Sequence, residues 1–527
     1  MGIYLNPANK GFAIAKNSKI YVDKTQLIQF TNSVLSTEQR FICVSRPRRF
    51  GKSITAQMLS AYYEKDHDSR NLFQGLRIEM CDTFEDHLNQ YHVLFFEMQR
   101  FLHRAQSPSA LVSYLQKMVL KEIKEIYASC LDPDETDLII ALETISEKTG
   151  QEFIFIIDEW DCIFREARYD KTAQKHYLDF LRDLLKGQAY VKLAYMTGIL
   201  PVKKYGTHSA LNMFCEYSMT APGDLAPFTG FTESEVCHLC QIHGMDFSEM
   251  QKWYDGYKCK NLSHVYNPKS VVDAMLNKDY RSYWSGTETY EALKIYIDLN
   301  FDGLKDAVIA MLANTRCRIN TGKFQNDMTT FKSKDDVLTL LVHLGYLAYD
   351  ESSEEVYIPN MEIAEEFKNA IEDGSWTTIA AVLKESDDLL TAALCGDTRK
   401  VAAGTDAAHM ENTSILSYHN ENSLSCVIAI AFFSARRHYL LYREFPTGKG
   451  FADMVFLPRP SSDKPAMIVE LKWDLSAYGA IRQIREKNYV KALEHYHGNI
   501  QLVGISYDKK TKHHTCCIET FCKTTDS

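Results

Sequence analysis

The sequence predicts an α/β fold in which a parallel, doubly wound sheet comes first and a smaller α/β region follows near the C-terminus. Three apolar runs, each ending in polar residues, carry this prediction; they cover residues 41–45, 153–157 and 191–198. A run that is apolar throughout suits a strand buried on both faces, as in a parallel sheet covered by helices. Strands that alternate with helices over this span place a ligand at the carboxyl ends of the strands.

Further elements complete the predicted order in the first half. Residues 11–60 are expected to run strand, short helix, strand, loop and helix. Another strand is expected over Tyr91–Met98, and the apolar spacing of Pro108–Tyr127 predicts a helix.

Length and composition predict a multidomain chain with proper hydrophobic cores. The 527 residues are enough for two to four domains, and 45% of them are hydrophobic. The formal charge of −10 argues against a chain coated in basic residues. It does not exclude a nucleic-acid contact, because the relevant charge is the charge of one groove.

The fourteen cysteines are interpreted as reduced thiols of a cytoplasmic protein. The first residues show no basic flank with an apolar core, and no apolar run approaches the ~20 residues that span a bilayer. We therefore expect no membrane partner. One cluster also fits a zinc site, but we favour buried thiols on a helix over Ser234–Ile242. The cluster consists of Cys237, Cys240, His243, Cys259 and His264.

A phosphate-binding loop is predicted where the first strand ends, at Gly51-Lys52-Ser53. Backbone N–H groups at the start of the following helix would face the phosphates of ATP. Lys52 would reach the β- and γ-phosphates, and the Ser53 hydroxyl would ligate Mg²⁺. The first glycine of the general pattern is replaced by Arg46.

Three arginines lie in this loop, at positions 46, 48 and 49. Arg46, Arg48 and Arg49 are candidates to contact the phosphates. Binding to neighbouring carboxylates is the alternative, and no arginine finger is assigned.

Asp158 and Glu159 end the second apolar run and are interpreted as the acidic half of the same site. Asp158 would hold Mg²⁺, and Glu159 would polarise the attacking water. An ordinary polar loop is the alternative. Thr197, at the end of the third run, is a candidate sensor of the γ-phosphate, and a simple Thr-Gly turn is its alternative.

The middle of the chain predicts a helical, aromatic lid followed by a winged-helix-like unit. The lid is expected from about 230 to 300, and the unit from 332 to 363. In that unit a helix over Lys334–Leu344 precedes two short strands around Leu347–Tyr349 and Glu355–Ile358. Residues 385–417 are expected to link this part to a last domain.

The last 110 or so residues predict a second site on a compact α/β unit. The expected elements are helix Glu421–Ala435, strands His438–Phe445, Phe451–Leu457 and Ala466–Trp473, helix Ala477–His497, and strand Gln501–Tyr507.

Asp453 and Glu470 lie on the two central strands of this unit. A hairpin would bring them together as ligands of Mg²⁺, with Glu421 as a further carboxylate. Glu470 and Lys472 share one face of their strand, so Lys472 could orient the attacking water. Gln483 and Tyr489 could line the same cleft. A solvated strand is the alternative.

Together these motifs resemble a bacterial AAA-ATPase-like family whose members carry a C-terminal PD-(D/E)XK nuclease-superfamily domain. The resemblance rests on YVDKT (21–25), RPRRFGKS (46–53), FTGFTESEV (228–236), WYDGY (253–257), GKGFAD (448–453) and IVELK (468–472). It implies a P-loop NTPase with a helical lid and a winged-helix-like linker, then a restriction-endonuclease-like domain. The implied domains are 1–230, 231–310, 311–384 and 385–527.

Two functions follow as expectations. One is an ATPase coupled to a Mg²⁺-dependent nuclease that cleaves DNA, with ATP and Mg²⁺ as cofactors. The other is a nucleotide-switched regulator that binds DNA or protein without cutting. Self-association into a homo-oligomer stays open at this point.

Overall fold

The structure is a computed structural model, in which two compact units are distinguished by their internal contacts. Unit 1 comprises residues 1–280 and 318–356, and unit 2 comprises residues 281–317 and 357–527. The residues described are 2–202, 204–205, 208–209, 211–259, 262–284, 289–299, 301, 303–326, 328–329, 331–372, 377–412, 421–447, 450–459 and 462–522.

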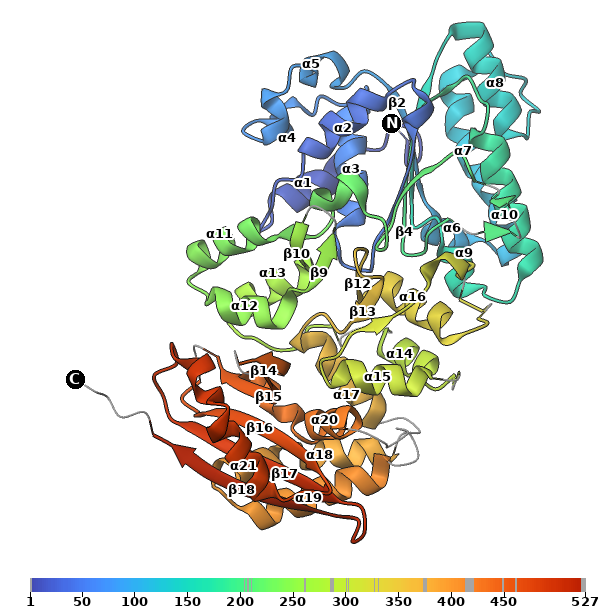
Figure 1. Cartoon of the computed structure of the whole chain (residues 1–527). Coiled ribbons are helices and arrows are strands. Elements are labelled where there is room, and N and C mark those ends of the chain that lie inside the picture. Colours follow the sequence, from blue (N-terminus) through green and yellow to red (C-terminus); the bar gives the residue numbers. More distant parts are fainter. Residues whose placement is uncertain are drawn as a thin grey trace. The chain divides into compact units, whose positions relative to one another are not determined.

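Unit 1 is built on a five-stranded sheet in the order β2-β3-β4-β1-β7. All four neighbour pairs in this order are parallel. Helices flank it, with α1–α3 on one side and α7, α8 and α10 on the other (Figure 1). Its strands are β1 (Phe41–Ser45), β2 (His92–Glu97), β3 (Phe153–Asp158), β4 (Val191–Gly198) and β7 (Cys215–Tyr217).

The apolar runs form the centre of this sheet because both of its faces are covered. All residues of β1 and β3 are buried, as parallel strands between helix layers require. The helices of this part are α1 (Lys10–Lys16), α2 (Gln26–Val34), α3 (Lys52–Tyr63), α4 (Arg70–Phe73), α5 (Phe84–His87), α6 (Met98–Arg104), α7 (Leu111–Tyr127), α8 (Leu138–Thr149), α9 (Cys162–Glu166) and α10 (Lys171–Leu185).

The remainder of unit 1 is helical with small antiparallel sheets. A three-stranded sheet, β8-β10-β9, joins the helices in the region where only a helical lid is predicted. Its strands are β8 (Phe231–Thr232), β9 (Tyr257–Cys259) and β10 (Leu262–Tyr266), and the hairpin strands β5 (Lys204–Tyr205) and β6 (His208–Ser209) precede them. The helices are α11 (Glu233–His243), α12 (Phe247–Tyr254), α13 (Pro268–Asn277) and α16 (Lys334–Leu344).

The helix and two strands of the predicted winged-helix-like unit are present. Helix α16 is followed by β12 (Ala348–Asp350) and β13 (Glu355–Tyr357). Gly345 ends the helix with a φ of 88°, a conformation that favours glycine.

Unit 2 contains a second five-stranded sheet in the order β14-β15-β16-β17-β18. Helix α21 covers one face, where Val455, Ile468, Ile481 and Ile484 belong to one buried cluster. The strands are β14 (Tyr439–Pro446), β15 (Phe451–Pro458), β16 (Ala466–Trp473), β17 (Ile500–Asp508) and β18 (His513–Phe521). The helices are α14 (Thr289–Ile297), α15 (Leu304–Leu312), α17 (Met361–Glu372), α18 (Thr377–Leu394), α19 (Thr398–Asn412), α20 (Glu421–Ala431) and α21 (Ala477–Glu486).

Several sequence-based expectations are wrong in detail. The first strand expected after residue 11 is helix α1. The expected link over 385–417 contains the whole of α19 and the end of α18, which pack together because Gly404 brings its backbone against Leu389. Its residues 413–417 lie outside the described part of the chain.

The long helix expected over 477–497 ends at Glu486. Asn488 then adopts a φ of 53°, which breaks the helix, and a 3₁₀ turn over Tyr489–Leu493 follows. Strand β18 was not predicted. The predicted domain boundaries at 230, 310 and 384 stay a prediction.

Candidate functional sites

The candidate nucleotide site of unit 1 lies where β1, β3 and β4 end side by side. Because β4 pairs with both other strands, their carboxyl ends bring the predicted loop, Asp158 and Thr197 to one edge. Thr197 donates a hydrogen bond from its hydroxyl to Asp158, and both side chains are buried. The structure thus brings together the three motifs that the sequence analysis singled out.

Lys52 opens helix α3 and is held by the loop itself. Its Nζ donates to the carbonyl oxygens of Arg46 and Pro47, at 2.9 and 2.7 Å. Gly51 precedes it with a φ of 86°, which gives the loop its tight entry into the helix. Burial lowers the pKa of Lys52 to about 8, although Asp158, Asp161 and Glu159 act in the opposite direction. Ser53, the next residue, is partly buried at the same helix start.

The three loop arginines occupy different environments. Arg46 is buried and donates to the carbonyl oxygens of Ser45 and Tyr217, at 3.0 and 2.9 Å. It therefore ties the loop to strand β7. Arg48 and Arg49 are partly buried, and Arg49 has a φ of 72°. Phosphate contacts by any of the three stay a prediction.

Arg165 and Asp161 belong to this site although the sequence analysis did not assign them. Arg165, on α9, contacts Glu159 at 3.0 Å and Asp161 at 3.3 Å. Asp161 is fully buried and accepts hydrogen bonds from the backbone of Ile199 and Leu200. The available signal was the spacing of four residues between Asp161 and Arg165, which pairs opposite charges on a helix.

The candidate nuclease site of unit 2 is built on β15 and β16. These strands are antiparallel, with Met454 opposite Val469, and one step further along this register Asp453 faces Glu470. The Asp453 carboxylate also accepts a hydrogen bond from the Leu471 N–H at 2.7 Å. The predicted hairpin therefore brings the two acidic residues together.

Lys472 and Gln483 meet the same carboxylate. Lys472 Nζ lies 2.9 Å from Glu470 Oε1, and Gln483 donates to that oxygen from α21. Tyr489 is 3.1 Å from the Gln483 amide nitrogen. Gly504 makes this packing feasible, because a Cβ on it would lie 2.3 Å from the backbone oxygen of Ala477 at the start of α21.

Glu470 is the electrostatic centre of the site. It is 2% exposed, and its Oε2 has no hydrogen-bond partner among the described residues. Burial and the charge of Asp453 raise its pKa to about 7, while Lys472 acts in the opposite direction. A buried carboxylate with a free oxygen beside a second carboxylate fits a divalent cation.

The remaining metal-ligand prediction concerns Glu421. This residue begins α20, but its side chain lies outside the described part. Within the described residues, no group of three or more His, Cys, Asp and Glu side chains is placed to hold a metal. In the same residues, no helix is long and apolar enough to cross a membrane.

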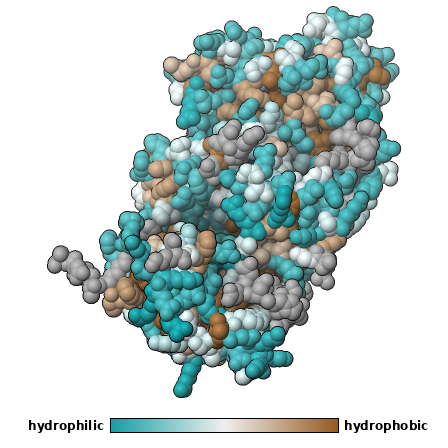
Figure 2. Space-filling model, in the orientation of Figure 1, coloured by the Kyte–Doolittle hydropathy of each residue, from teal (hydrophilic) through white to brown (hydrophobic). Residues whose placement is uncertain are grey.

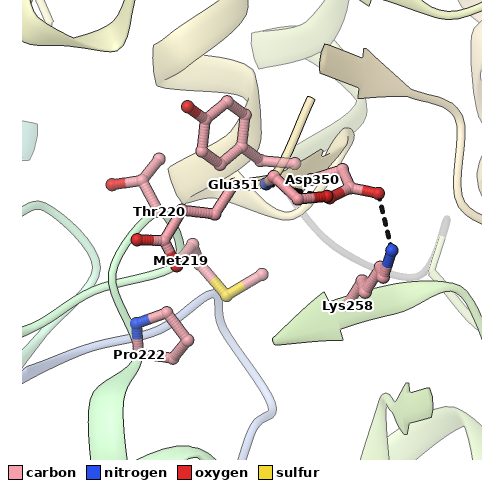
Figure 3. Close-up of a pocket in the computed structure, with 8 residues that line it drawn as sticks. Met219, Thr220, Pro222, Lys258, Asp350 and Glu351 are labelled. Carbon is pink, nitrogen blue, oxygen red and sulfur yellow. Dashed lines mark hydrogen bonds and ion pairs between the residues drawn. The ribbon is translucent and has the colours of Figure 1, made fainter. Parts of the chain in front are cut away.

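A separate cavity of about 330 Å³ lies in unit 1 beside the winged-helix-like strands. Its polar wall is internally paired, since Lys258 Nζ lies 2.7 Å from Asp350 Oδ2 (Figure 3). None of the predicted site residues lines it. The lining residues are Met219, Thr220, Pro222, Lys258, Tyr349, Asp350, Glu351 and Ser352.

Comparison with known proteins assigns both regions to families. Residues 11–207 match the family model described as "Predicted AAA-ATPase", and residues 419–515 match that of the PD-(D/E)XK nuclease superfamily. The chain thus carries an AAA-ATPase-like domain followed by a PD-(D/E)XK nuclease-like domain. These families imply the use of a nucleotide and of a divalent metal in general terms.

No curated protein matches the chain. Among solved structures, CDC6P from Pyrobaculum aerophilum aligns with 70% of this chain and 99% of its own, at 10% identity and a TM-score of 0.24.

Proposed function

We propose that this protein is an ATPase coupled to a Mg²⁺-dependent nuclease that cleaves DNA phosphodiester bonds. The observation that carries the proposal is the convergence of Asp453, Glu470, Lys472 and Gln483 at one end of β15 and β16. The same chain holds a phosphate-binding loop with Lys52 at a helix N-terminus. A cytoplasmic location and a bacterial origin are part of this proposal.

In the nuclease-like site, Asp453 and the free oxygen of Glu470 would hold Mg²⁺. A bound Mg²⁺ supplies Lewis-acid stabilisation and a water of lowered pKa. Lys472 places a positive charge beside Glu470, where negative charge develops on a phosphate under attack. Gln483, on α21, donates a hydrogen bond to Oε1 of Glu470 and so fixes the orientation of the carboxylate. The other oxygen, Oε2, would then be oriented toward the metal.

In the nucleotide site, Lys52 and the N-terminus of α3 would bind the phosphates of ATP. Ser53 and Asp158 would hold its Mg²⁺, and Thr197 would keep Asp158 in place. Glu159 would orient the attacking water once released from Arg165. Both proposed reactions therefore use a carboxylate pair and a lysine.

The test is a cleavage assay on plasmid and linear DNA with Mg²⁺ or Mn²⁺, with and without ATP. We expect Asp453→Ala to abolish cleavage and to leave ATP binding intact. Lys52→Ala is expected to remove the effect of ATP. Asp463→Ala, at an exposed position on the loop before β16, is the matched control. Undiminished cleavage by Asp453→Ala would refute the nuclease assignment.

A nucleotide-switched regulator that binds DNA or protein without cutting is the second candidate. It is favoured by the pairing of Lys472 with Glu470 and by the lack of a third described acidic ligand. It predicts no cleavage under any condition, together with an ATP-dependent change in protease sensitivity that Lys52→Ala abolishes.

A further inference from the structure

Three large hydrophobic side chains are exposed on the segments that flank the candidate nuclease site. Phe451 is 64% exposed and lies two residues before Asp453, at the start of β15. Leu475 and Tyr478 are 66% and 65% exposed; Leu475 lies two residues after the end of β16, and Tyr478 lies in the first turn of α21. Because β15 and β16 are antiparallel, the start of one and the end of the other lie at the same edge of the sheet.

Single exposed hydrophobic residues are common on protein surfaces, and one face of this molecule is largely hydrophilic with scattered hydrophobic patches (Figure 2). What distinguishes these three is their place. Each lies within six residues of Asp453 or Lys472, at the end of β15 and β16 where those two side chains lie. Solvent-exposed turns and loops are usually built from polar residues, glycine and proline rather than from large apolar side chains.

Tyr478 is presented on a rigid support. The hydroxyl oxygen of Ser476 accepts a hydrogen bond from the Gly479 N–H at 3.0 Å and so caps α21. Gly504, the β17 partner of Glu470, lets the first turn of α21 approach the sheet. The backbone that carries Tyr478 is therefore fixed against the sheet that bears the carboxylates.

Positive side chains accompany this edge. Arg482 lies one turn after Tyr478 on α21 and is 69% exposed, with Glu486 at 3.6 Å. Lys487 Nζ would lie 3.7 Å from a Cβ on Gly450, so it lies near the residue that precedes β15. Lysine and arginine beside exposed aromatic rings are the combination that binds single-stranded nucleic acid, because the cations contact phosphates and the rings stack on bases.

We infer that the candidate nuclease site takes single-stranded or unpaired DNA, with Phe451 and Tyr478 stacking on bases beside the phosphate to be cut. This inference rests on the proposed function and specifies its substrate. A continuous duplex hides the faces of its bases inside the stack, so it cannot use these rings. Leu475 is a further exposed apolar side chain at the same end of these strands.

The test is a binding measurement that does not depend on cleavage. Fluorescence anisotropy without metal compares a labelled single strand of about 16 nucleotides with a hairpin duplex of the same sequence. Phe451→Ala and Tyr478→Ala are each expected to weaken single-strand binding about tenfold and duplex binding less than about twofold. Tyr478→Trp is expected to restore binding. Tyr169→Ala, which removes an 86% exposed tyrosine of unit 1, is the control without effect.

Equal binding of both DNA forms by the unaltered protein, or equal losses for both forms in the variants, would overturn the inference. Cleavage by the unaltered protein and by Asp453→Ala is measured in parallel on both DNA forms. Cleavage of duplex alone would overturn the inference and keep the proposed nuclease. Selective single-strand binding with no cleavage would support this recognition surface and count against the proposed nuclease.

Discussion

The two candidate sites bury charges of opposite sign. In unit 1 a lysine is buried, and its ammonium group is held by the carbonyl oxygens of Arg46 and Pro47. In unit 2 a glutamate is buried, and one of its oxygens has no partner in the described residues. Burial lowers the pKa of Lys52 to about 8 and raises the pKa of Glu470 to about 7.

The difference indicates the sign of the charge that a ligand of each site would carry. A buried ammonium group whose pKa is lowered gains from an added anion, and a phosphate at the α3 N-terminus is such an anion. A buried carboxylate whose pKa is raised gains from an added cation. Unit 1 also contains an arginine that pairs with two of its carboxylates, whereas in unit 2 Lys472 pairs with Glu470, and the charge of Asp453 acts on the same glutamate.

The largest loss of stability is expected from the removal of Arg165. Arg165→Met leaves the buried Asp161 without its cationic partner, so we expect unit 1 to lose about 3–5 kcal/mol of its free energy of unfolding. Urea unfolding measures this loss. Arg182→Met is the matched control, because Arg182 pairs with Asp179 and Asp183 at the surface and should contribute less than about 1 kcal/mol. Equal losses in the two variants would contradict the pairing described for Asp161.

Removal of the buried lysine tests the anion site. Lys52→Ala is expected to lower ATP hydrolysis at least about 100-fold, because a charge aimed at the phosphates is lost. It should also abolish the rise in melting temperature that ATP produces. Phosphate release and thermal unfolding with and without ATP measure the two effects. Lys121→Ala, at an exposed position on α7, should behave like the unaltered protein. Retention of the ATP-induced shift by Lys52→Ala would place the nucleotide elsewhere.

Neutralisation of the buried glutamate tests the cation site, and here we expect a gain in stability in the absence of metal. The pKa of Glu470 is raised from 4.5 to about 7 on folding, so its stabilising contribution is complete below pH 4.5 and is lost as the pH rises through 7. At pH 8 the ionised carboxylate therefore costs about 3 kcal/mol relative to the protonated form. Glu470→Gln keeps the acceptor for Lys472 and Gln483 and removes this cost.

We expect metal-free Glu470→Gln to be more stable than the unaltered protein at pH 8 by about 2–3 kcal/mol and equally stable near pH 4.5. Added Mg²⁺ should stabilise the unaltered protein and not the variant. Glu486→Gln, 69% exposed on α21, is the control with no pH-dependent difference. A variant that is less stable than the unaltered protein at pH 8 would show that Lys472 and Gln483 already offset the cost of burying the ionised Glu470 carboxylate.

Much of both sites could be predicted from the sequence because the relevant signals are local. The apolar strands 41–45 and 153–158 and the Gly51-Lys52-Ser53 turn are contiguous, and strand pairing then brings them together. The pair Asp453 and Glu470 followed from one hairpin register. Burial of Arg46 could not be predicted, because its partner Tyr217 lies 171 residues away in the chain.

The parts that were missed depend on contacts or on backbone conformation. Arg165 lies shortly after the Asp158-Glu159 motif in the chain, and it pairs with both Glu159 and Asp161. The position of Asp161 depends on hydrogen bonds from the backbone of Ile199 and Leu200, which follow β4. The helix over 477–497 was predicted too long because Asn488 breaks it through its own backbone dihedral. Residues 398–412 contain small residues, which fit either a linker or closely packed helices. In the structure they form a helix, because Gly404 allows close packing on α18.

Two glycines, one beside each site, are expected to change stability less than the charged residues do. Gly504→Ala would place a Cβ 2.3 Å from the Ala477 backbone oxygen, so α21 must shift and Gln483 must move away from Glu470. We expect a loss of about 1–3 kcal/mol in the free energy of unfolding of unit 2.

Gly51→Ala meets no atom within 4 Å, and its cost comes from the φ of 86° alone, about 1 kcal/mol. Gly51→Asn should be tolerated better than Gly51→Ala, since asparagine adopts positive φ more readily, whereas Gly504→Asn should be worse than Gly504→Ala because it is larger. Urea unfolding of the four variants separates the two causes. If Asn were less stable than Ala at position 51 as well as at position 504, the space available to the side chain, and not the backbone conformation, would determine stability in the phosphate-binding loop.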